Sequence, residues 1–152
     1  MKNNHTRALN LMILTILLSL GSCCVPCRQP APKIGVLEEY SFRLIELNTR
    51  AVEQEVITVR FSAEEKMFYG TAPCNNFFGS YHLYDAKGTE RNIEFSNVGA
   101  TRKMCPDVDM SIEEDFAALL SRVKRVMFEG DNLVLVDTGE SIVAVLERET
   151  LQ

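Results

Sequence analysis

Short stretches in which apolar and polar residues alternate recur from about residue 40 to residue 147, and turn-forming residues separate them. Ile57, Val59 and Phe61, for example, alternate with polar residues. A period of two is typical of half-buried β-strands, because successive side chains of a strand point to opposite faces. This pattern predicts strands at residues 40–47, 56–61, 66–72, 80–84, 92–95, 125–129, 132–137 and 141–147.

One stretch has helical periodicity instead, with apolar residues at i, i+3, i+4 and i+7 forming a single stripe. The stripe consists of Phe116, Leu119, Leu120 and Val123. Ser111 and Glu114 have the spacing of a capping box, so we expect a helix from about residue 111 to residue 123. Many short strands around one helix predict an α+β fold in which the helix packs on an antiparallel sheet. Periodicity alone leaves open whether that sheet curls into a barrel.

The predicted helix has positions that we expect in the core and positions that we expect at the surface. Leu120 lies on the apolar stripe, whereas Glu113 lies in the first turn, where the helix dipole favours negative charge. We therefore expect Glu113 to be exposed, and Glu113→Ala to destabilise the fold far less than Leu120→Ala.

The N-terminus has the pattern of an export signal. Lys2 and Arg7 precede an apolar run at residues 8–20, which is too short to cross a bilayer core of about 30 Å as a helix. Gly21, Ser22 and Cys23 follow, and together with Leu20 they resemble the bacterial lipobox, whose cysteine is lipidated. The alternative is an ordinary cleaved signal.

This interpretation divides the chain into three parts. Residues 1–22 are the predicted lipoprotein signal peptide, and residues 23–38, which contain three prolines, are the predicted tether. Residues 39–148 are the predicted folded domain. We expect lipidation at Cys23 to anchor the protein to a membrane of the bacterial cell envelope, most simply the outer membrane.

The charge of the chain limits its partners. The formal net charge is −5 at pH 7, and the predicted signal contains basic residues but no acidic ones, so the remainder is more negative still. Nucleic acid requires clustered Lys and Arg and is excluded as an expected partner. Anionic lipid is also unfavourable, so membrane contact should come through the acyl anchor.

The sequence contains five cysteines. If Cys23 carries lipid, four remain, and an even number in an exported chain suggests disulfides. We expect Cys74 and Cys105 to be bonded to each other, with two buried free thiols or a catalytic thiol as the alternatives. Cys24 and Cys27 form a C-x-x-C on the tether, where a local disulfide or two idle thiols fits better than a redox motif, which needs a βαβ context.

Enzyme motifs are absent from the sequence. His82 is the only histidine after the predicted signal, so any triad that uses histidine would need it, and its place in a strand favours a structural role. The sequence has no nucleophile elbow, phosphate loop or H-E-x-x-H zinc motif. We expect no catalytic residue, no metal and no cofactor.

The densest cluster of turn-forming and aromatic residues lies between Gly70 and Tyr81. Asn75 and Asn76 can bond turn backbone, and Gly79 can admit a close neighbour. One interpretation is a rigid loop that joins two strands. The other is a ligand-binding loop that contains Asn75, Asn76, Gly79 and Tyr81, because loops on rigid scaffolds often bind ligands.

This stretch, with the T-x-x-x-C that follows, resembles the META/HslJ-like domain family of small envelope proteins. Members carry G-x-x-G-C-N-x-x-x-G-x-Y, then a threonine and a cysteine, a helix and a C-terminal strand meander. The matching positions here are Gly70, Cys74, Asn75, Gly79, Tyr81, Thr101 and Cys105. Pro73 replaces the usual glycine before the first cysteine, and Phe42 stands for the usual tryptophan, which this chain lacks.

The resemblance covers residues 39–148. It implies a barrel-like antiparallel domain with one helix, an association with envelope stress, drug tolerance or virulence, and no established catalytic activity. We expect a non-enzymatic module that binds an envelope protein or maintains the envelope. The alternatives are a carrier that holds a small apolar molecule or lipid in a cleft of the curled sheet, and a thiol-based enzyme. A continuous apolar cavity would favour the carrier, and a closed core with an exposed apolar patch would favour protein binding.

Overall fold

The computed structural model describes residues 34–149, apart from residues 54–56, 88, 107 and 109. The predictions for the signal peptide, for lipidation at Cys23 and for Cys24 and Cys27 lie outside the described residues. The described chain starts with a 3-10 helix, η1 (Ile34–Glu39), whose Leu37 side chain is fully buried. Residues 34–38, which we predicted as the end of the tether, therefore belong to the folded domain. None of the described helices is long and apolar enough to cross a membrane.

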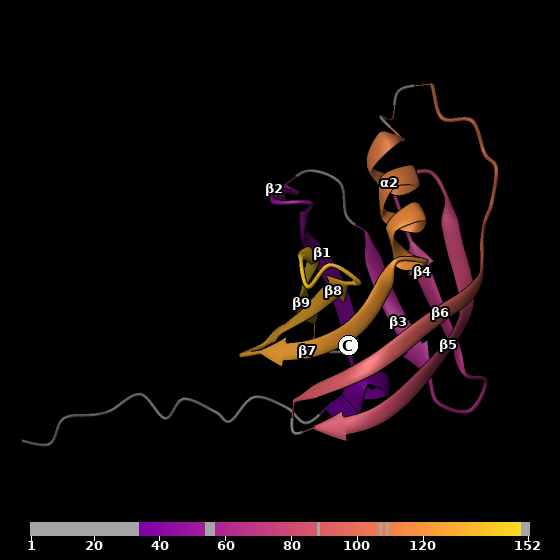
Figure 1. Cartoon of the computed structure of the whole chain (residues 1–152). Coiled ribbons are helices and arrows are strands. Elements are labelled where there is room, and N and C mark those ends of the chain that lie inside the picture. The colour runs from indigo at the N-terminus through magenta and orange to yellow at the C-terminus, as the bar shows by residue number, and fades with distance from the viewer. Residues whose placement is uncertain (1–33, 54–56, 88, 107, 109, 150–152) are drawn as a thin grey trace, which may run out of the picture.

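Eight antiparallel strands form a closed barrel (Figure 1). They are β1 (Ser41–Leu47), β3 (Thr58–Ser62), β4 (Met67–Thr71), β5 (Asn76–Lys87), β6 (Glu90–Ala100), β7 (Val123–Glu129), β8 (Asn132–Asp137) and β9 (Ile142–Glu149). Each strand pairs with the next, and β9 pairs with β1 to close the ring. The short β2 (Arg50–Ala51) pairs only with the end of β1. The predicted α+β fold, with a barrel-like antiparallel sheet and one α-helix, α2 (Ser111–Leu120), is confirmed.

Two strands are longer than their sequence pattern predicts. β5 has 12 residues and β6 has 11, whereas alternation indicated only residues 80–84 and 92–95. The pairing of β5 with β6 shifts register twice, and Asp85 and Asn97 within these strands have φ of 31° and 53°. Because a bulge adds an unpaired residue, it interrupts the period of two that the sequence analysis relies on.

Aromatic rings fill the interior of the barrel. A chain of neighbouring rings, with centroids 5.1–6.5 Å apart, runs from β7 across the barrel to α2. It consists of Phe128, Phe42, Phe61, Phe95, Phe68, Phe77 and Phe116, all of them buried. The edge-on pairs among them stabilise a core by about 0.5–1.5 kcal/mol each beyond the burial of their area. A rigid, ring-packed core therefore supports the walls of the barrel.

Two glycines of the family motif make room for these rings. Gly70 pairs across the strands with Phe77, and Gly79 pairs with Phe68. A Cβ atom added to Gly70 would lie 1.8 Å from the Phe77 ring, and one added to Gly79 would lie 2.6 Å from the Phe68 ring. Each glycine is thus required because an aromatic ring from the neighbouring strand occupies the space of its missing side chain.

The helix α2 lies where two neighbouring strands of the barrel separate. β6 pairs with β7 only through Glu90, Arg91 and Asn92, and beyond this point the chain passes through α2 before it returns as β7 (Figure 1). α2 buries Ile112, Phe116, Leu119 and Leu120 toward the barrel, so the predicted stripe does face the core. Val123, also predicted to be helical, is fully buried as the first residue of β7.

The predicted capping box is wrong. Met110 is the N-cap of α2, it makes no side-chain cap hydrogen bond, and Ser111 is already the first helical residue. The spacing of Ser111 and Glu114 fits the motif, but the backbone enters the helix one residue earlier than the motif requires. The glutamate that matters at this helix start is the preceding one, Glu113.

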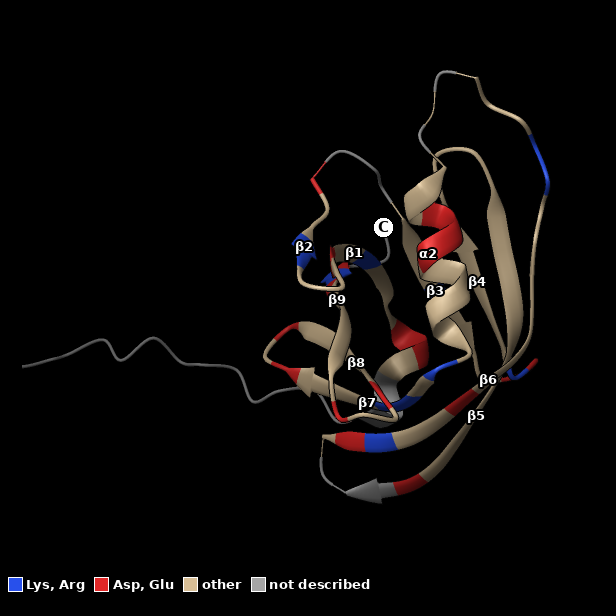
Figure 2. Ribbon diagram, turned by 45° about the horizontal axis from the view of Figure 1, so that its top comes forward, with Lys and Arg blue, Asp and Glu red and all other residues tan. Residues whose placement is uncertain are grey.

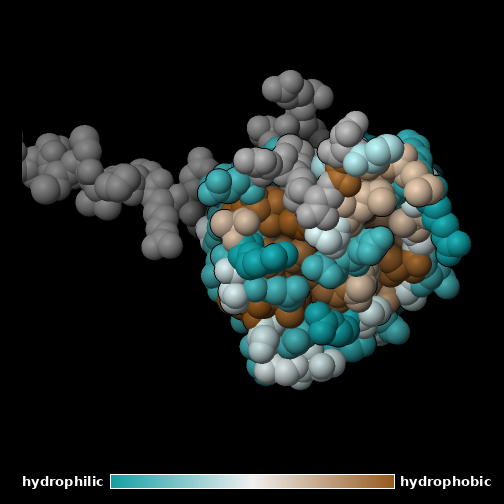
Figure 3. Space-filling view, turned by 90° about the horizontal axis from the view of Figure 1, so that it is seen from above, coloured by the Kyte–Doolittle hydropathy of each residue, from teal (hydrophilic) through white to brown (hydrophobic). Residues whose placement is uncertain are grey.

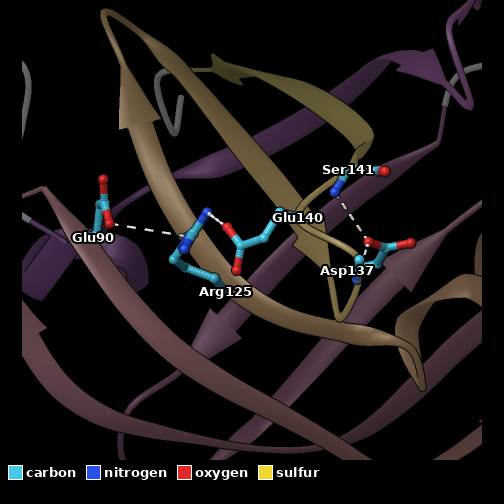
Figure 4. A network of polar contacts seen from close by, with 6 residues as sticks. Glu90, Arg125, Asp137, Glu140 and Ser141 are labelled. Carbon is cyan, nitrogen blue, oxygen red and sulfur yellow. Dashed lines mark hydrogen bonds and ion pairs between the residues drawn. The ribbon is translucent and has the colours of Figure 1, made fainter.

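A polar network lies beside the short pairing of β6 with β7. The Arg125 guanidinium of β7 pairs with Glu140 at 2.5 Å and lies 4.0 Å from Glu90 of β6 (Figure 4). In the turn between β8 and β9, the Asp137 carboxylate accepts hydrogen bonds from the backbone N–H groups of Gly139 and Ser141. Half-exposed ion pairs contribute at most about 1 kcal/mol each, so this network fixes geometry more than it adds stability.

Candidate functional site

The connection between β4 and β5 is a tight turn that carries two residues of the family motif. Thr71 pairs with Asn76, and the Ala72 N–H donates to the Asn75 carbonyl oxygen at 2.9 Å. Pro73 and Cys74 therefore occupy the tip of the hairpin. The turn begins after Thr71 because proline has no N–H with which to continue the ladder.

The Asn75 side chain joins this turn to two other segments. Its Oδ1 accepts hydrogen bonds from the Thr101 hydroxyl at 2.9 Å and from the Lys103 N–H at 2.8 Å. Its Nδ2 donates to Glu113 of α2 at 3.2 Å. One amide thus bridges the β4–β5 turn, the β6–α2 connection and the helix, using both its acceptor and its donor.

Glu113 completes this arrangement. The residue is only 6% exposed. Its carboxylate accepts hydrogen bonds from the Cys74 N–H at 2.6 Å and the Asn75 N–H at 3.1 Å, as well as from the Asn75 side chain. Our expectation that Glu113 lies at the surface is wrong, because the turn supplies backbone donors that make burial of its charge favourable.

A disulfide reinforces the same junction. Cys74 and Cys105 are bonded to each other, with their Cα atoms 6.0 Å apart, which lies within the usual range of about 4.4–6.8 Å. Cys74 is buried. We name Cys74, Asn75, Thr101, Cys105 and Glu113 the Asn75 cluster; it ties the β4–β5 turn to the β6–α2 connection and to the start of α2.

The predicted ligand-binding loop does not exist as a loop. Asn76, Gly79 and Tyr81 are paired residues of β5, and only Asn75 belongs to a turn. Gly79 is buried beneath the Phe68 ring, and Tyr81 is buried with its ring 5.2 Å from that of Phe61. The sequence did not indicate this part of β5 as a strand, because apolar and polar residues do not alternate cleanly near its bulge.

Tyr81 acts at the opposite end of the barrel from the Asn75 cluster. Its hydroxyl donates to the Glu38 carboxylate of η1 at 2.8 Å and lies 3.3 Å from the Ser62 carbonyl oxygen. Burial raises the pKa of the Tyr81 hydroxyl above its usual value, and the hydrogen bond to Glu38 raises that pKa further. Tyr81 therefore stays neutral and holds η1 against the barrel.

The remaining chemistry of the described residues is limited. His82 is exposed on the outer wall, where its ring lies edge-on to Tyr84 with centroids 4.4 Å apart. Within the described ranges, no group of three or more His, Cys, Asp or Glu residues is placed to hold a metal ion. The cysteines that a thiol mechanism would need in that part of the chain are those of the disulfide.

A cleft that the sequence did not indicate lies beside the Asn75 cluster, with a volume of about 380 Å³. One wall is formed by Met110, the N-cap of α2, and by Glu113, Glu114 and Ala117 of the helix. The other wall is the end of β6 and the connection that follows, from Ala100 through Met104. Asn75 and Phe77 of the β4–β5 hairpin complete the lining. Figure 3, which views this end of the barrel from above, shows hydrophobic residues reaching the surface among polar ones.

The charges around this cleft are divided between its walls. Arg102 and Lys103 lie on the β6–α2 connection, and Glu113 and Glu114 lie in the first turns of α2 (Figure 2). Glu113 is fully engaged within the Asn75 cluster, whereas neither Arg102 nor Lys103 forms an ion pair with any described residue. Among the described residues, the connection therefore contributes two cations without ion partners to one wall, and the exposed carboxylate of Glu114 lies on the other wall.

Comparison with known proteins supports the family resemblance. Residues 36–150 match the META domain family. No curated protein matches the sequence. Two solved structures are similar in fold. One is an NMR structure of a protein from Burkholderia xenovorans, with a TM-score of 0.60 and 23% identity over an alignment that covers 77% of this chain and 86% of that one. The other is a crystal structure of a DUF4847 family protein from Bacteroides vulgatus, with a TM-score of 0.53 and 12% identity over 78% of this chain and 98% of that one. Neither comparison indicates an enzymatic activity. Because the match spans most of the sequence and includes the Asn75 cluster, this chain belongs to the META domain family.

Proposed function

We propose that this protein is a lipid-anchored module of the bacterial cell envelope that binds a partner and does not catalyse a reaction. The observation that carries the proposal is the structural role of each residue of the family motif. Gly70 and Gly79 admit core rings, Tyr81 holds η1, and the remaining motif residues belong to the Asn75 cluster. Because all of these residues support the frame, the open cleft beside them is the best candidate for the functional surface.

The core of the barrel favours partner binding over the carrier alternative. A carrier of the kind we considered would hold its ligand within the curled sheet, but the ring chain from Phe128 to Phe116 packs there. The cleft lies on the outside instead, and its volume falls near the lower end of the usual range for ligand sites, about 300–1,000 Å³.

The position of the cleft suits an anchored protein. η1, which connects the barrel to the N-terminal part of the chain, lies at the end of the barrel opposite to α2 and the β4–β5 turn (Figure 1). A lipid on Cys23 would hold the η1 end toward the membrane. The cleft would then face away from the membrane, where a protein of the envelope can reach it.

The anchor is tested by labelling cells with a palmitate analogue. Cys23→Ala should abolish the label and release the protein from the membrane fraction, because the acceptor sulfur is lost. Cys27→Ala is the matched control and should keep both label and location. A Cys23→Ala variant that remains labelled and membrane-bound would overturn the proposed anchor.

The binding role is tested by photo-crosslinking in intact cells. A photo-reactive amino acid placed at Met104, on the cleft, should give a discrete crosslinked adduct. The same amino acid at His82, exposed on the outer wall at β5, should not. Equal crosslinking patterns from the two positions would show that the cleft has no special role.

A further inference from the structure

The wall of the cleft contains an unpaired strand edge. β6 pairs along its length with β5 on one side, but its other side meets β7 only through residues 90–92. From Ile93 onward, β6 therefore has a neighbour on one side alone among the described strands. The chain that follows β6 runs beside the start of β5 and the β4–β5 turn. The Thr101 N–H donates to the Asn76 carbonyl oxygen, and the Lys103 N–H donates to the Asn75 side chain.

Because only every second residue of this segment bonds to the hairpin, the backbone groups of the residues in between are exposed. In an extended strand, successive residues direct their N–H and C=O groups to opposite sides. Residues 101–105 follow the end of β6, and the N–H groups of Thr101 and Lys103 both bond to the β4–β5 hairpin, as alternate residues of an extended chain do. We therefore expect Arg102 and Met104 to direct their backbone groups away from the hairpin. Both residues are exposed, Met104 to 88%, and neither backbone N–H has a partner among the described residues. An edge of this kind is a template for a further strand.

The cleft beside this edge can accept an apolar side chain. It exists because Ala100 and Ala117 present short side chains from its two walls, and Phe77, Met104 and Met110 add apolar surface. Methionines adapt their shape readily to a partner. Strand addition takes affinity from backbone hydrogen bonds and specificity from pockets that receive alternate side chains. Here the edge and the pocket adjoin.

The free charges determine which peptide fits. In an extended segment Arg102 lies on the same face as Ala100, and it forms no ion pair in the described part of the chain, so an acidic residue of the partner would complement it. Resting on the proposed binding function, we infer that the cleft receives an extended segment of a partner protein. That segment pairs with the backbone of Arg102 and Met104, inserts one apolar side chain between Ala100 and Ala117, and places a carboxylate beside Arg102.

The test uses the full-length protein purified in detergent and fluorescein-labelled heptapeptides, with fluorescence anisotropy as the readout. The peptides are threonine-rich and carry Leu, Met or Phe at the centre and Asp, Glu or Lys two residues away. Acidic peptides with an apolar centre should bind in a saturable manner, and about tenfold more tightly than their lysine counterparts. Arg102→Glu should reverse this preference. Absence of saturable binding across the peptide set at millimolar concentration would overturn the inference.

Two matched comparisons locate the site. Ala117→Leu fills the cleft and should weaken peptide binding at least about tenfold, whereas Ala118→Leu, at the neighbouring exposed position of α2, should leave it unchanged. Equal effects of the two substitutions would overturn the site.

N-methylation of the peptide amides that face Arg102 and Met104 should abolish binding. If N-methylated peptides bind as well as the parent, strand pairing is wrong, while a specific crosslink from Met104 would still support the proposed function.

Discussion

The two ends of the barrel are closed in different ways. At the α2 end, a disulfide, a buried carboxylate and the Asn75 amide join three segments that are distant in sequence. At the η1 end, the side chains that the structure describes contribute the buried Leu37 and a hydrogen bond from Tyr81 to Glu38. A cavity of about 260 Å³ near η1, lined in part by Tyr40 and Arg60, is smaller than the cleft at the α2 end.

This difference indicates which end must keep its shape. A binding cleft needs walls with fixed spacing, because preorganised sites lose less entropy when the partner binds. The Asn75 cluster sets the distance between the β6–α2 connection and α2, which are the two walls. The η1 end needs only to connect the barrel to the preceding chain. Substitutions at each end of the barrel test this contrast.

Removal of the Glu113 carboxylate should have the largest effect. Glu113→Ala should lower the free energy of unfolding by roughly 3–5 kcal/mol, since it removes charged hydrogen bonds and leaves buried backbone donors unpaired. This is comparable to the roughly 2–5 kcal/mol expected for the core truncation Leu120→Ala. Urea unfolding of the purified variants measures both values.

Glu114→Ala is the matched control, because Glu114 is adjacent, acidic and exposed. It should change stability by no more than about 0.5 kcal/mol. If Glu113→Ala and Glu114→Ala had the same small effect, the Asn75 cluster would not be the stabilising junction that we describe.

Loss of the disulfide should have the next effect. Replacing both Cys74 and Cys105 by Ala should lower stability by about 3–4 kcal/mol in the chain-entropy model for a sequence separation of 31 residues. Amide hydrogen exchange should increase first at the β6–α2 connection, and exchange at η1 should change little. Uniform acceleration across both ends would contradict the separation between them.

At the other end of the barrel, the expected change is smaller. Tyr81→Phe removes the hydrogen bond to Glu38 and should cost about 1–2 kcal/mol, while the ring stays packed against Phe61. Tyr84→Phe is the control, because its exposed hydroxyl bonds an exposed carboxylate on the outer wall. Increased exchange at η1, with the α2 end unchanged, is the expected signature.

The smallest effect is a dependence on alkaline pH. Tyr81 has a raised pKa in the folded state, so above pH 10.0 the unfolded chain loses this proton first, and the folded state becomes less stable as the pH rises. The cost of Tyr81→Phe should therefore shrink between about pH 10 and pH 12. A cost that is constant or grows over this range, in urea titrations of the two proteins, would contradict the buried neutral hydroxyl.

The sequence predicted the elements better than their assembly. Alternation located the strands, and the stripe of Phe116, Leu119 and Leu120 gave the helix and its buried face, because these patterns are local. Closure of the ring depends on pairing of Leu44 with Leu146, about a hundred residues apart, and no local pattern encodes that pairing. The barrel followed only from the family resemblance.

The candidate site was less predictable for two physical reasons. The sequence alone does not distinguish a solvated acidic residue in a first helical turn from a buried one. Glu113 does lie three residues before Phe116, however, and therefore on the same face as the apolar stripe. That spacing was the available signal. The cleft arises from the short side chains of Ala100 and Ala117 at positions far apart in sequence, so only the folded chain reveals it.

The pairing of β9 with both β1 and β8 has a consequence for synthesis. A ribosome delivers β9 after every other described strand, so a nascent chain that stops before Ile142 has unpaired edges on β1 and β8. Such edges readily pair with other chains. The barrel can therefore close only after translation has passed its last strand, and chains truncated by even this one strand are expected to be cleared or to aggregate rather than persist as smaller domains.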